Sequence, residues 1–248
     1  AGLKLYDEVI TTPMTFAATA NAALFVGARP VFADIDDTTY NIDVSEIERH
    51  ITSRSKALVP VHYTGLPCDM EEIYEIARCN NLAVIEDACH ALGAKYKDTV
   101  IGDCTFSDMT VFSFHPVKHI TTGEGGIITT NSESLYQKLI KLRSHGITRD
   151  NDTFKEPSHG DWYYEMQDLG FNYRLTDIQA ALGISQLKKL DSFVARRRQI
   201  VNRYNKAFQE LPLELPSEPE GCFSSYHLYV IRLKKESKKT GKYLYNRL

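Results

Sequence analysis

Short runs of apolar and β-branched residues recur along residues 1–150, and stretches with helical spacing of apolar positions separate several of them. The runs are EVITTP (8–13), RPVFADID (29–36), ALVPVHY (57–63), LAVIEDA (82–88), MTVFSF (109–114) and GGIITT (125–130). Such runs are typical of buried strands, and strands that alternate with helices pack as layers. The pattern predicts a large α/β domain over residues 1–150, with a mostly parallel central sheet flanked by helices.

The rest of the chain has a different pattern. Residues 151–175 are polar and aromatic without a regular period, which predicts a loop that leaves the large domain. Thr176 and Gln179 then have the spacing of a capping box, and apolar residues follow at steps of three and four. This predicts one long connecting helix over 176–212. Residues 213–248, with YHLYVIRL as a strand, are expected to begin a small C-terminal domain that is incomplete.

Composition and charge exclude several classes of protein. The chain has 248 residues and a formal net charge of −3, without a basic stripe, so we expect no nucleic-acid partner. No apolar run approaches the roughly 20 residues that a membrane span needs, and the N-terminus lacks the order of a signal peptide, which favours a cytoplasmic protein. Five cysteines without a C-x-x-C pair argue against disulfides and against a metal site.

Polar residues follow two of the apolar runs at their ends. LAVI leads directly into Glu86 and Asp87, and MTVFSF is followed by Lys118 before a glycine-rich turn. By itself, Lys118 would be interpreted as a surface residue whose stem lies along the protein. In parallel α/β sheets, however, ligands bind outside the carboxyl ends of the strands, so an acid and a lysine there can face one crevice. Pyridoxal phosphate needs such a pair: an amine that binds it covalently and a carboxylate that keeps its pyridine nitrogen protonated.

Four separated motifs extend this interpretation. They are PMTFAATANAALFVGARPVFADID (13–36), IEDACHALGA (85–94), SFHPVKHITTGEGG (113–126) and GFNYRLTDIQAALG (170–183). In this order they resemble the nucleotide-sugar aminotransferases of the DegT family, over nearly the whole chain. The resemblance implies a fold-type I aminotransferase whose large domain binds pyridoxal 5'-phosphate. Within the family, the chain most resembles the UDP-4-amino-4,6-dideoxy-N-acetyl-beta-L-altrosamine transaminases of pseudaminic acid synthesis.

The resemblance assigns roles to five residues around the cofactor. Lys118 is similar to the catalytic lysine that binds the cofactor covalently, and Asp87 to the partner of the pyridine nitrogen. Ser113 resembles the serine that contacts the phosphate, His90 the residue near the ring oxygen, and Phe16 the aromatic side chain that stacks on the ring. Taken singly, the serine could be satisfied within its strand end, and His90 and Phe16 would more often belong to a core.

Three further residues are implied to contact a neighbouring subunit or the substrate. Asn172 matches the asparagine that reaches the phosphate of the neighbouring subunit's cofactor, which implies a homodimer, and Arg174 lies beside it in the sequence. His227 resembles a histidine that approaches the nucleotide sugar. A strand histidine whose ring is satisfied by nearby backbone is an equally good interpretation of His227.

The implied reaction moves an amino group, with glutamate as the expected donor, to C4 of a UDP-linked 4-keto-6-deoxy sugar. One alternative is a sugar dehydratase of the same family, but those enzymes carry histidine where this chain carries Lys118. The other is a non-catalytic fragment or degenerate aminotransferase domain. Family members begin with a helix and a glycine-and-threonine loop that binds phosphate, whereas this chain starts at about the next strand. An open sheet edge beside GGIITT is then expected.

Overall fold

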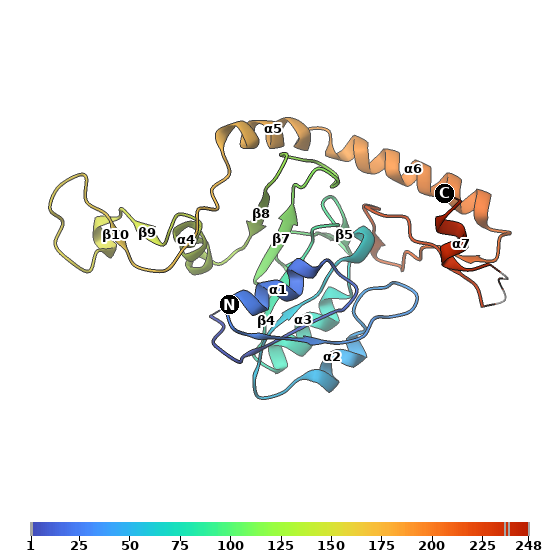
Figure 1. Ribbon diagram of the computed structural model, residues 1–248, viewed down its shortest axis with the longest axis horizontal. Helices are drawn as coiled ribbons and strands as arrows, with labels where there is room; N and C mark the ends of the chain where they lie inside the picture. The colour runs from blue at the N-terminus through green and yellow to red at the C-terminus, as the bar shows by residue number, and fades with distance from the viewer. Residues whose placement is uncertain (1, 236, 238, 248) are drawn as a thin grey trace.

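The computed structural model of the protein describes residues 2–235, 237 and 239–247, and Figure 1 shows how they are arranged. The elements in chain order are β1 (Glu8–Thr11), α1 (Ala17–Phe25), β2 (Arg29–Phe32), α2 (Val44–His50), β3 (Ser55–Val59), the 3₁₀ turn η1 (Tyr63–Gly65), α3 (Met70–Cys79), β4 (Ala83–Asp87), β5 (Lys95–Tyr96), β6 (Thr99–Val100), β7 (Met109–Ser113), β8 (Gly126–Thr129), α4 (Glu133–Leu142), β9 (Ile147–Thr148), the 3₁₀ turn η2 (Asn151–Thr153), β10 (Glu165–Met166), α5 (Asp177–Leu187), α6 (Leu190–Phe208), β11 (Leu213–Glu214), β12 (Cys222–Phe223), β13 (Arg232–Leu233) and α7 (Gly241–Tyr245).

The described residues build a six-stranded sheet in the order β2-β1-β3-β4-β7-β8. Five of these strands lie within one of the six apolar runs, and β3 begins two residues before the run ALVPVHY. Neighbours from β2 to β7 pair in parallel, and β8 pairs antiparallel with β7. The prediction of an α/β fold with a mostly parallel sheet is therefore confirmed. β2 and β8 are the two edge strands of the described sheet, and Ile127 and Ile128 on β8 are 49% and 42% exposed.

Alternating residues of the strands bury two different faces of the sheet. Ile10 and Leu58 belong to a large core cluster that includes residues of α2 and α3, whereas their neighbours Val9 and Ala57 pack in a second cluster with Ala23 of α1. Side chains of a strand point to opposite faces in turn, so helices that cover both faces require apolar residues at successive positions. This is why the strands appear in the sequence as continuous apolar runs.

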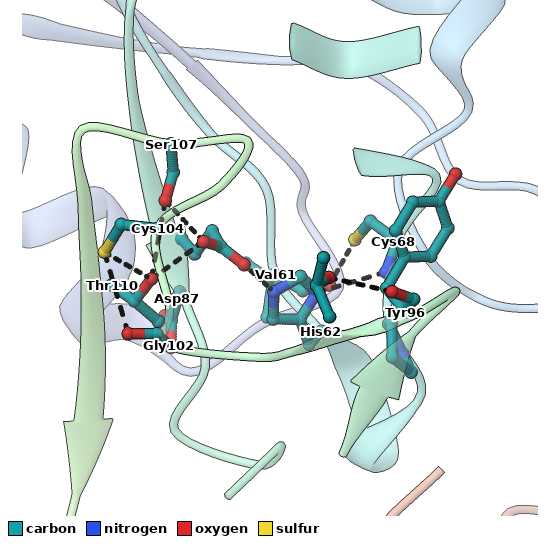
Figure 2. A network of polar contacts seen from close by, with 12 residues as sticks. Val61, His62, Cys68, Asp87, Tyr96, Gly102, Cys104, Ser107 and Thr110 are labelled. Atoms are coloured by element: carbon teal, nitrogen blue, oxygen red, sulfur yellow. Dashed lines mark hydrogen bonds and ion pairs between the residues drawn. The ribbon is translucent and has the colours of Figure 1, made fainter. Parts of the chain in front are cut away.

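A buried polar network ties the end of β4 to its neighbours (Figure 2). The carboxylate of Glu86 accepts hydrogen bonds from Ser107, from Thr110 of β7 at 2.7 Å and from Nε2 of His62 at 2.7 Å. Nδ1 of His62 accepts the N–H of Cys68 at 3.1 Å, so the proton of a neutral ring lies on Nε2. Burial by itself raises the pKa of Glu86, but these hydrogen bonds outweigh it and the pKa is lowered.

The segment expected to form one helix over 176–212 contains two. The predicted capping box is present: the Thr176 hydroxyl accepts from the backbone of Gln179, and the Gln179 side chain accepts from the backbone of Thr176. The first helix ends where the N–H of Lys189 bonds to the carbonyl of Gln186, an i to i+3 contact that tightens the last turn of α5. Apolar residues keep their three- and four-residue spacing across this turn, so the sequence pattern does not reveal the break.

Two other segments differ from the expected domain boundaries. β10, inside the expected loop 151–175, pairs antiparallel with β9, so the boundary at residue 150 passes through a hairpin. β12 pairs with β5 of the large domain, although it lies in the segment expected to begin a small domain. Within YHLYVIRL only Arg232–Leu233 are in a strand, β13. In the part of the chain that the structure describes, no helix has the length and apolar character needed to cross a membrane.

Replacing the buried carboxylate tests the network. Glu86→Gln should lower the free energy of unfolding by about 2–4 kcal/mol, because it leaves buried donors of Ser107, Thr110 and His62 without a charged acceptor. Glu75→Gln, at an exposed position of α3, is the matched control and should change stability by about 0.5 kcal/mol or less. Urea unfolding of the three proteins provides the measurement. Equal losses in both variants would show that the network is not specially stabilising.

Candidate active site

Two strand ends place polar side chains on the same face of the sheet. Asp87 is the last residue of β4 and pairs with Val111 of β7, and Ser113 ends β7 two residues further on. Phe112, which precedes Ser113 and points to the opposite face of the sheet, packs in the core cluster that contains residues of α2 and α3. Because the side-chain period of a strand is two residues, Asp87 and Ser113 face the side covered by α1.

Backbone and side-chain donors fix the Asp87 carboxylate. The N–H of Cys89 lies 3.2 Å from Oδ1, and Oγ1 of Thr19, in the first turn of α1, lies 2.7 Å from Oδ2. Sequence reasoning missed Thr19. A signal exists, since Thr15 and Thr19 are hydroxyl residues four positions apart in an otherwise apolar stretch, which is the spacing of neighbours on a helix.

Lys118 lies in the turn that connects β7 to β8. Its N–H bonds to the carbonyl of His115 at 2.9 Å, and Phe114 joins both sides of the turn by bonds to Gly125 and Thr122. Gly125 has φ +141°, and a Cβ there would come within 2.7 Å of Oγ1 of Thr122, so the position requires glycine.

The amine of Lys118 is half-buried beside the acid. Burial lowers the pKa of Lys118, and the electrostatic influence of Cys89 and Asp87 opposes this effect without cancelling it. Both of those residues follow or end β4, so acid and amine lie within electrostatic reach of one another. A lowered pKa increases the fraction of free amine at neutral pH, and the free amine is the form that acts as nucleophile or base.

Three histidines pack together next to Lys118. The rings of His90 and His227 are 4.5 Å apart between centroids, and those of His119 and His227 are 5.5 Å apart. Nε2 of His119 lies 3.1 Å from the carbonyl of Ser225, so it carries the proton and donates. Within the described residues, Nδ1 of each of the three rings is buried without a hydrogen-bond partner. Sequence reasoning had not selected His119.

The three rings are neutral at physiological pH. Burial lowers the pKa of His90 to about 4, that of His119 to about 4 and that of His227 to about 3, and the nearby charge of Lys118 acts in the same direction on all three. No group of three metal-ligating side chains in the described part of the chain is arranged to hold a metal ion. Nδ1 of His119, whose proton lies on Nε2, is a buried hydrogen-bond acceptor, and Nδ1 of His90 and of His227 is an acceptor or a donor according to the tautomer.

The segment that carries His227 is held against the loops of the large domain. The N–H of Ser225 bonds to the carbonyl of Gly65 at 3.0 Å, and Nη1 of Arg197 donates to the carbonyls of Tyr226 and His227 at 3.2 Å each. Gly65 has φ +100°, and a Cβ there would lie 2.9 Å from the nitrogen of Tyr226. Helix α6 and the loop after β3 thereby position the ring of His227.

The structure places the remaining candidates at different locations. Phe16 precedes α1 as its N-cap residue and is 77% exposed. Asn172 forms an isolated bridge with Ser144, and both Asn172 and Arg174 are exposed. In the sequence, Ser144 and Asn172 flank β9 and β10, and the arm that carries these two strands extends away from the sheet in Figure 1. The structure brings Asp87, His90, Lys118 and His227 together.

Comparison with known proteins identifies the family. The model of the DegT/DnrJ/EryC1/StrS aminotransferase family matches residues 1–248. The chain belongs to this family. MJ1066, an uncharacterized protein of Methanocaldococcus jannaschii, is 52% identical over 231 residues, which are 92% of this chain and 59% of the relative. The spore coat polysaccharide biosynthesis protein SpsC of Bacillus subtilis is 44% identical over 97% of this chain and 61% of its own length. A GDP-perosamine synthase of Escherichia coli O157:H7 is 39% identical over 93% of this chain and 59% of its own length.

Solved structures match over nearly the whole chain. Helicobacter pylori PseC, an aminotransferase involved in the biosynthesis of pseudoaminic acid, matches with a TM-score of 0.85 and 36% identity, over 93% of this chain and 59% of its own. TlmJ of Streptoalloteichus hindustanus matches with a TM-score of 0.88 and 32% identity, over 99% of this chain and 64% of its own. The chain thus spans about three fifths of the length of the curated relatives and structures it matches.

The cofactor of this family is pyridoxal phosphate, and one matched structure, a putative sugar aminotransferase of Streptococcus pneumoniae, is in its PLP form. The residues of this site fit that cofactor. The Asp87 carboxylate has two donors and retains free lone pairs for a pyridine N–H, and Lys118 supplies an amine with a lowered pKa. The unpaired Nδ1 of His90 supplies a further polar group at the same strand end.

The neutral histidines predict how stability depends on pH. Their folded pKa values lie near 3–4, below the ordinary value of 6.5, so the unfolded chain binds more protons between these limits. The free energy of unfolding should therefore fall as pH falls from about 6.5 toward 4. His119→Gln, which keeps an N–H donor, should make that slope shallower by up to about 1.4 kcal/mol per pH unit. Urea unfolding between pH 7 and pH 5 measures it, and an unchanged slope in His119→Gln would contradict the assignment.

Proposed function

We propose that this protein transfers an amino group from glutamate to C4 of a UDP-linked 4-keto-6-deoxy sugar, with pyridoxal phosphate as cofactor. The observation that carries the proposal is the convergence of the Asp87 carboxylate and the half-buried amine of Lys118 at adjoining strand ends. A carboxylate and a lysine in this relation are the two groups that transamination requires of the protein. Membership in an aminotransferase family supports the same reaction type.

When bound, pyridoxal phosphate supplies an electrophilic carbon for amines and a ring that accepts electrons from the α-carbon of the donor. In the proposed site, Asp87 accepts the pyridine N–H through the lone pairs that Thr19 and Cys89 leave free. The Ser113 hydroxyl, at the end of β7 on the face of Asp87, would donate to the phosphate. Phe16 would cover one face of the ring, and His90 would supply a polar group to the ring oxygen.

Lys118 is the proposed catalytic residue. Its Nζ would hold the cofactor covalently and, when free, would take the proton from the α-carbon of the donor. A base for this step works best when its pKa is near the working pH, and burial shifts the pKa of Lys118 in that direction. The three histidines around Lys118 are neutral, so they add no positive charge next to its amine.

The proposed partners are a second copy of the chain and the nucleotide sugar. Asn172, which is exposed, is proposed to reach the phosphate of the neighbouring subunit's cofactor in a homodimer. Arg174 and His227 are proposed to contact the substrate. The motif resemblance favours a UDP-linked sugar, and PseC, which this chain resembles in structure, is an aminotransferase of pseudoaminic acid biosynthesis. A GDP-perosamine synthase is similarly close in sequence, so the nucleotide needs a direct test.

Covalent labelling tests the cofactor site. After incubation with pyridoxal phosphate, the protein should develop the absorption of a lysine-bound cofactor, and borohydride reduction should fix the label on the peptide that contains Lys118. Lys118→Ala should lose the label and remain folded, because Lys118 lies in a turn and its side chain is not part of the core. Lys138→Ala, at an exposed position of α4, is the control and should label like the wild type. A label on any other lysine, or no label, would refute the proposal.

A substrate comparison tests the reaction. With ¹⁵N-glutamate, the protein should transfer ¹⁵N to a UDP-linked 4-keto-6-deoxy sugar at least about tenfold faster than to the GDP-linked analogue, measured by mass spectrometry of the amino sugar. Lys118→Ala should transfer none. Preference for the GDP-linked sugar would overturn the nucleotide assignment alone, and transfer to neither would overturn the function.

A further inference from the structure

The Asp87 carboxylate has a partner that the proposed chemistry does not use. Oγ1 of Thr19 lies 2.7 Å from Oδ2 of Asp87, and Oγ1 of Thr15 lies 2.8 Å from Oγ1 of Thr19. Thr19 is 9% exposed and belongs to the first turn of α1, where its N–H bonds to the carbonyl of Phe16. These contacts form a chain of hydrogen bonds from Thr15 through Thr19 to Asp87.

The direction of this chain is fixed by its last member. An ionised carboxylate only accepts hydrogen bonds, so the hydroxyl of Thr19 donates its one proton to Asp87. The contact between the two threonines must then use the proton of Thr15. Hydrogen bonds to a charged acceptor are about twice as strong as neutral ones, so the Thr19 bond holds Oδ2 firmly. The positive end of the α1 dipole, in the same turn, also favours a negative charge there.

The position of Asp87 matters because a cation is close by. Asp87 and Cys89 act on the charge of Lys118 from the end of β4, and the charge of Lys118 acts in turn on His90, His119 and His227. Among these neighbours Asp87 is the anion. A carboxylate free to rotate toward a neighbouring ammonium would stabilise the charged form of the amine. In the structure the carboxylate instead bonds to Thr19 and to the N–H of Cys89.

We propose that Thr19 is a positioning residue that holds the Asp87 carboxylate toward α1 and prevents it from closing onto Lys118. Thr19 thereby keeps the acid and the amine as two separate groups until a ligand lies between them. This inference rests on the proposed function, because it takes Asp87 and Lys118 as the two groups of one cofactor site. It adds a residue that acts through Asp87 and touches neither cofactor nor substrate.

The test measures the amine in protein that has been freed of cofactor. The reactivity of Lys118 toward acetic anhydride, followed by peptide mass spectrometry as a function of pH, reports the fraction of free amine. Thr19→Val removes the hydroxyl at nearly constant shape and helix propensity. It should raise the midpoint of Lys118 acylation by about one pH unit, because the released carboxylate pairs with the ammonium. Thr19→Ser keeps the hydroxyl and should return the midpoint to the wild-type value.

A second background separates positioning from a general structural effect. In Asp87→Asn the carboxylate is gone, so adding Thr19→Val should leave the midpoint of Lys118 acylation unchanged. An unchanged midpoint in Thr19→Val alone, or a shift that persists in the Asp87→Asn background, would overturn the inference. Thermal melting checks that each variant is folded, and Thr19→Ala takes the place of Thr19→Val if the latter does not fold. Failure of the proposed function is read separately, from the absence of a pyridoxal phosphate label on Lys118 in the wild type.

Discussion

Two adjacent carboxylates at the end of β4 point to opposite faces of the sheet, and the site depends on this constraint. Glu86 faces the buried cluster, where Ser107, Thr110 and His62 satisfy it, and Asp87 faces α1. A shift of the strand by one residue would exchange the two faces. The Glu86 network binds β4 to β7 and to the loop after β3, and so it fixes the register that presents Asp87 at the site.

The second group of the site is Lys118, whose pKa depends on its burial and on its neighbours. Lys118 is held by a turn whose backbone contacts require Gly125. Burial lowers the pKa of Lys118 by more than Asp87 and Cys89 raise it. The rings of His90, His119 and His227 also surround Lys118, and because they are neutral they do not balance its positive charge. The pKa of Lys118 is lowered although a carboxylate lies nearby, because burial outweighs the attraction of that carboxylate.

The sequence predicted much of this arrangement and missed other parts for physical reasons. All six strands of the sheet were predicted, since strands covered by helices on both faces need continuous apolar runs. The start of α5 was predicted from Thr176 and Gln179, whose capping box is a contact between residues three apart. The break between α5 and α6 was not, because apolar residues keep their spacing through it. The pairing of β12 with β5 was also missed, since two-residue strands leave no pattern.

By itself, the sequence determined the strands, the polar residues at their ends and the family to which those motifs belong, because each is a pattern of neighbouring residues. Only the tertiary structure decided which of these residues meet. Thr19 and Asp87 are separated by 68 positions and His119 and Ser225 by 106, and no local spacing encodes such contacts. They exist because the sheet order brings the ends of β4 and β7 next to the start of α1, and because α6 returns the last part of the chain to the same edge.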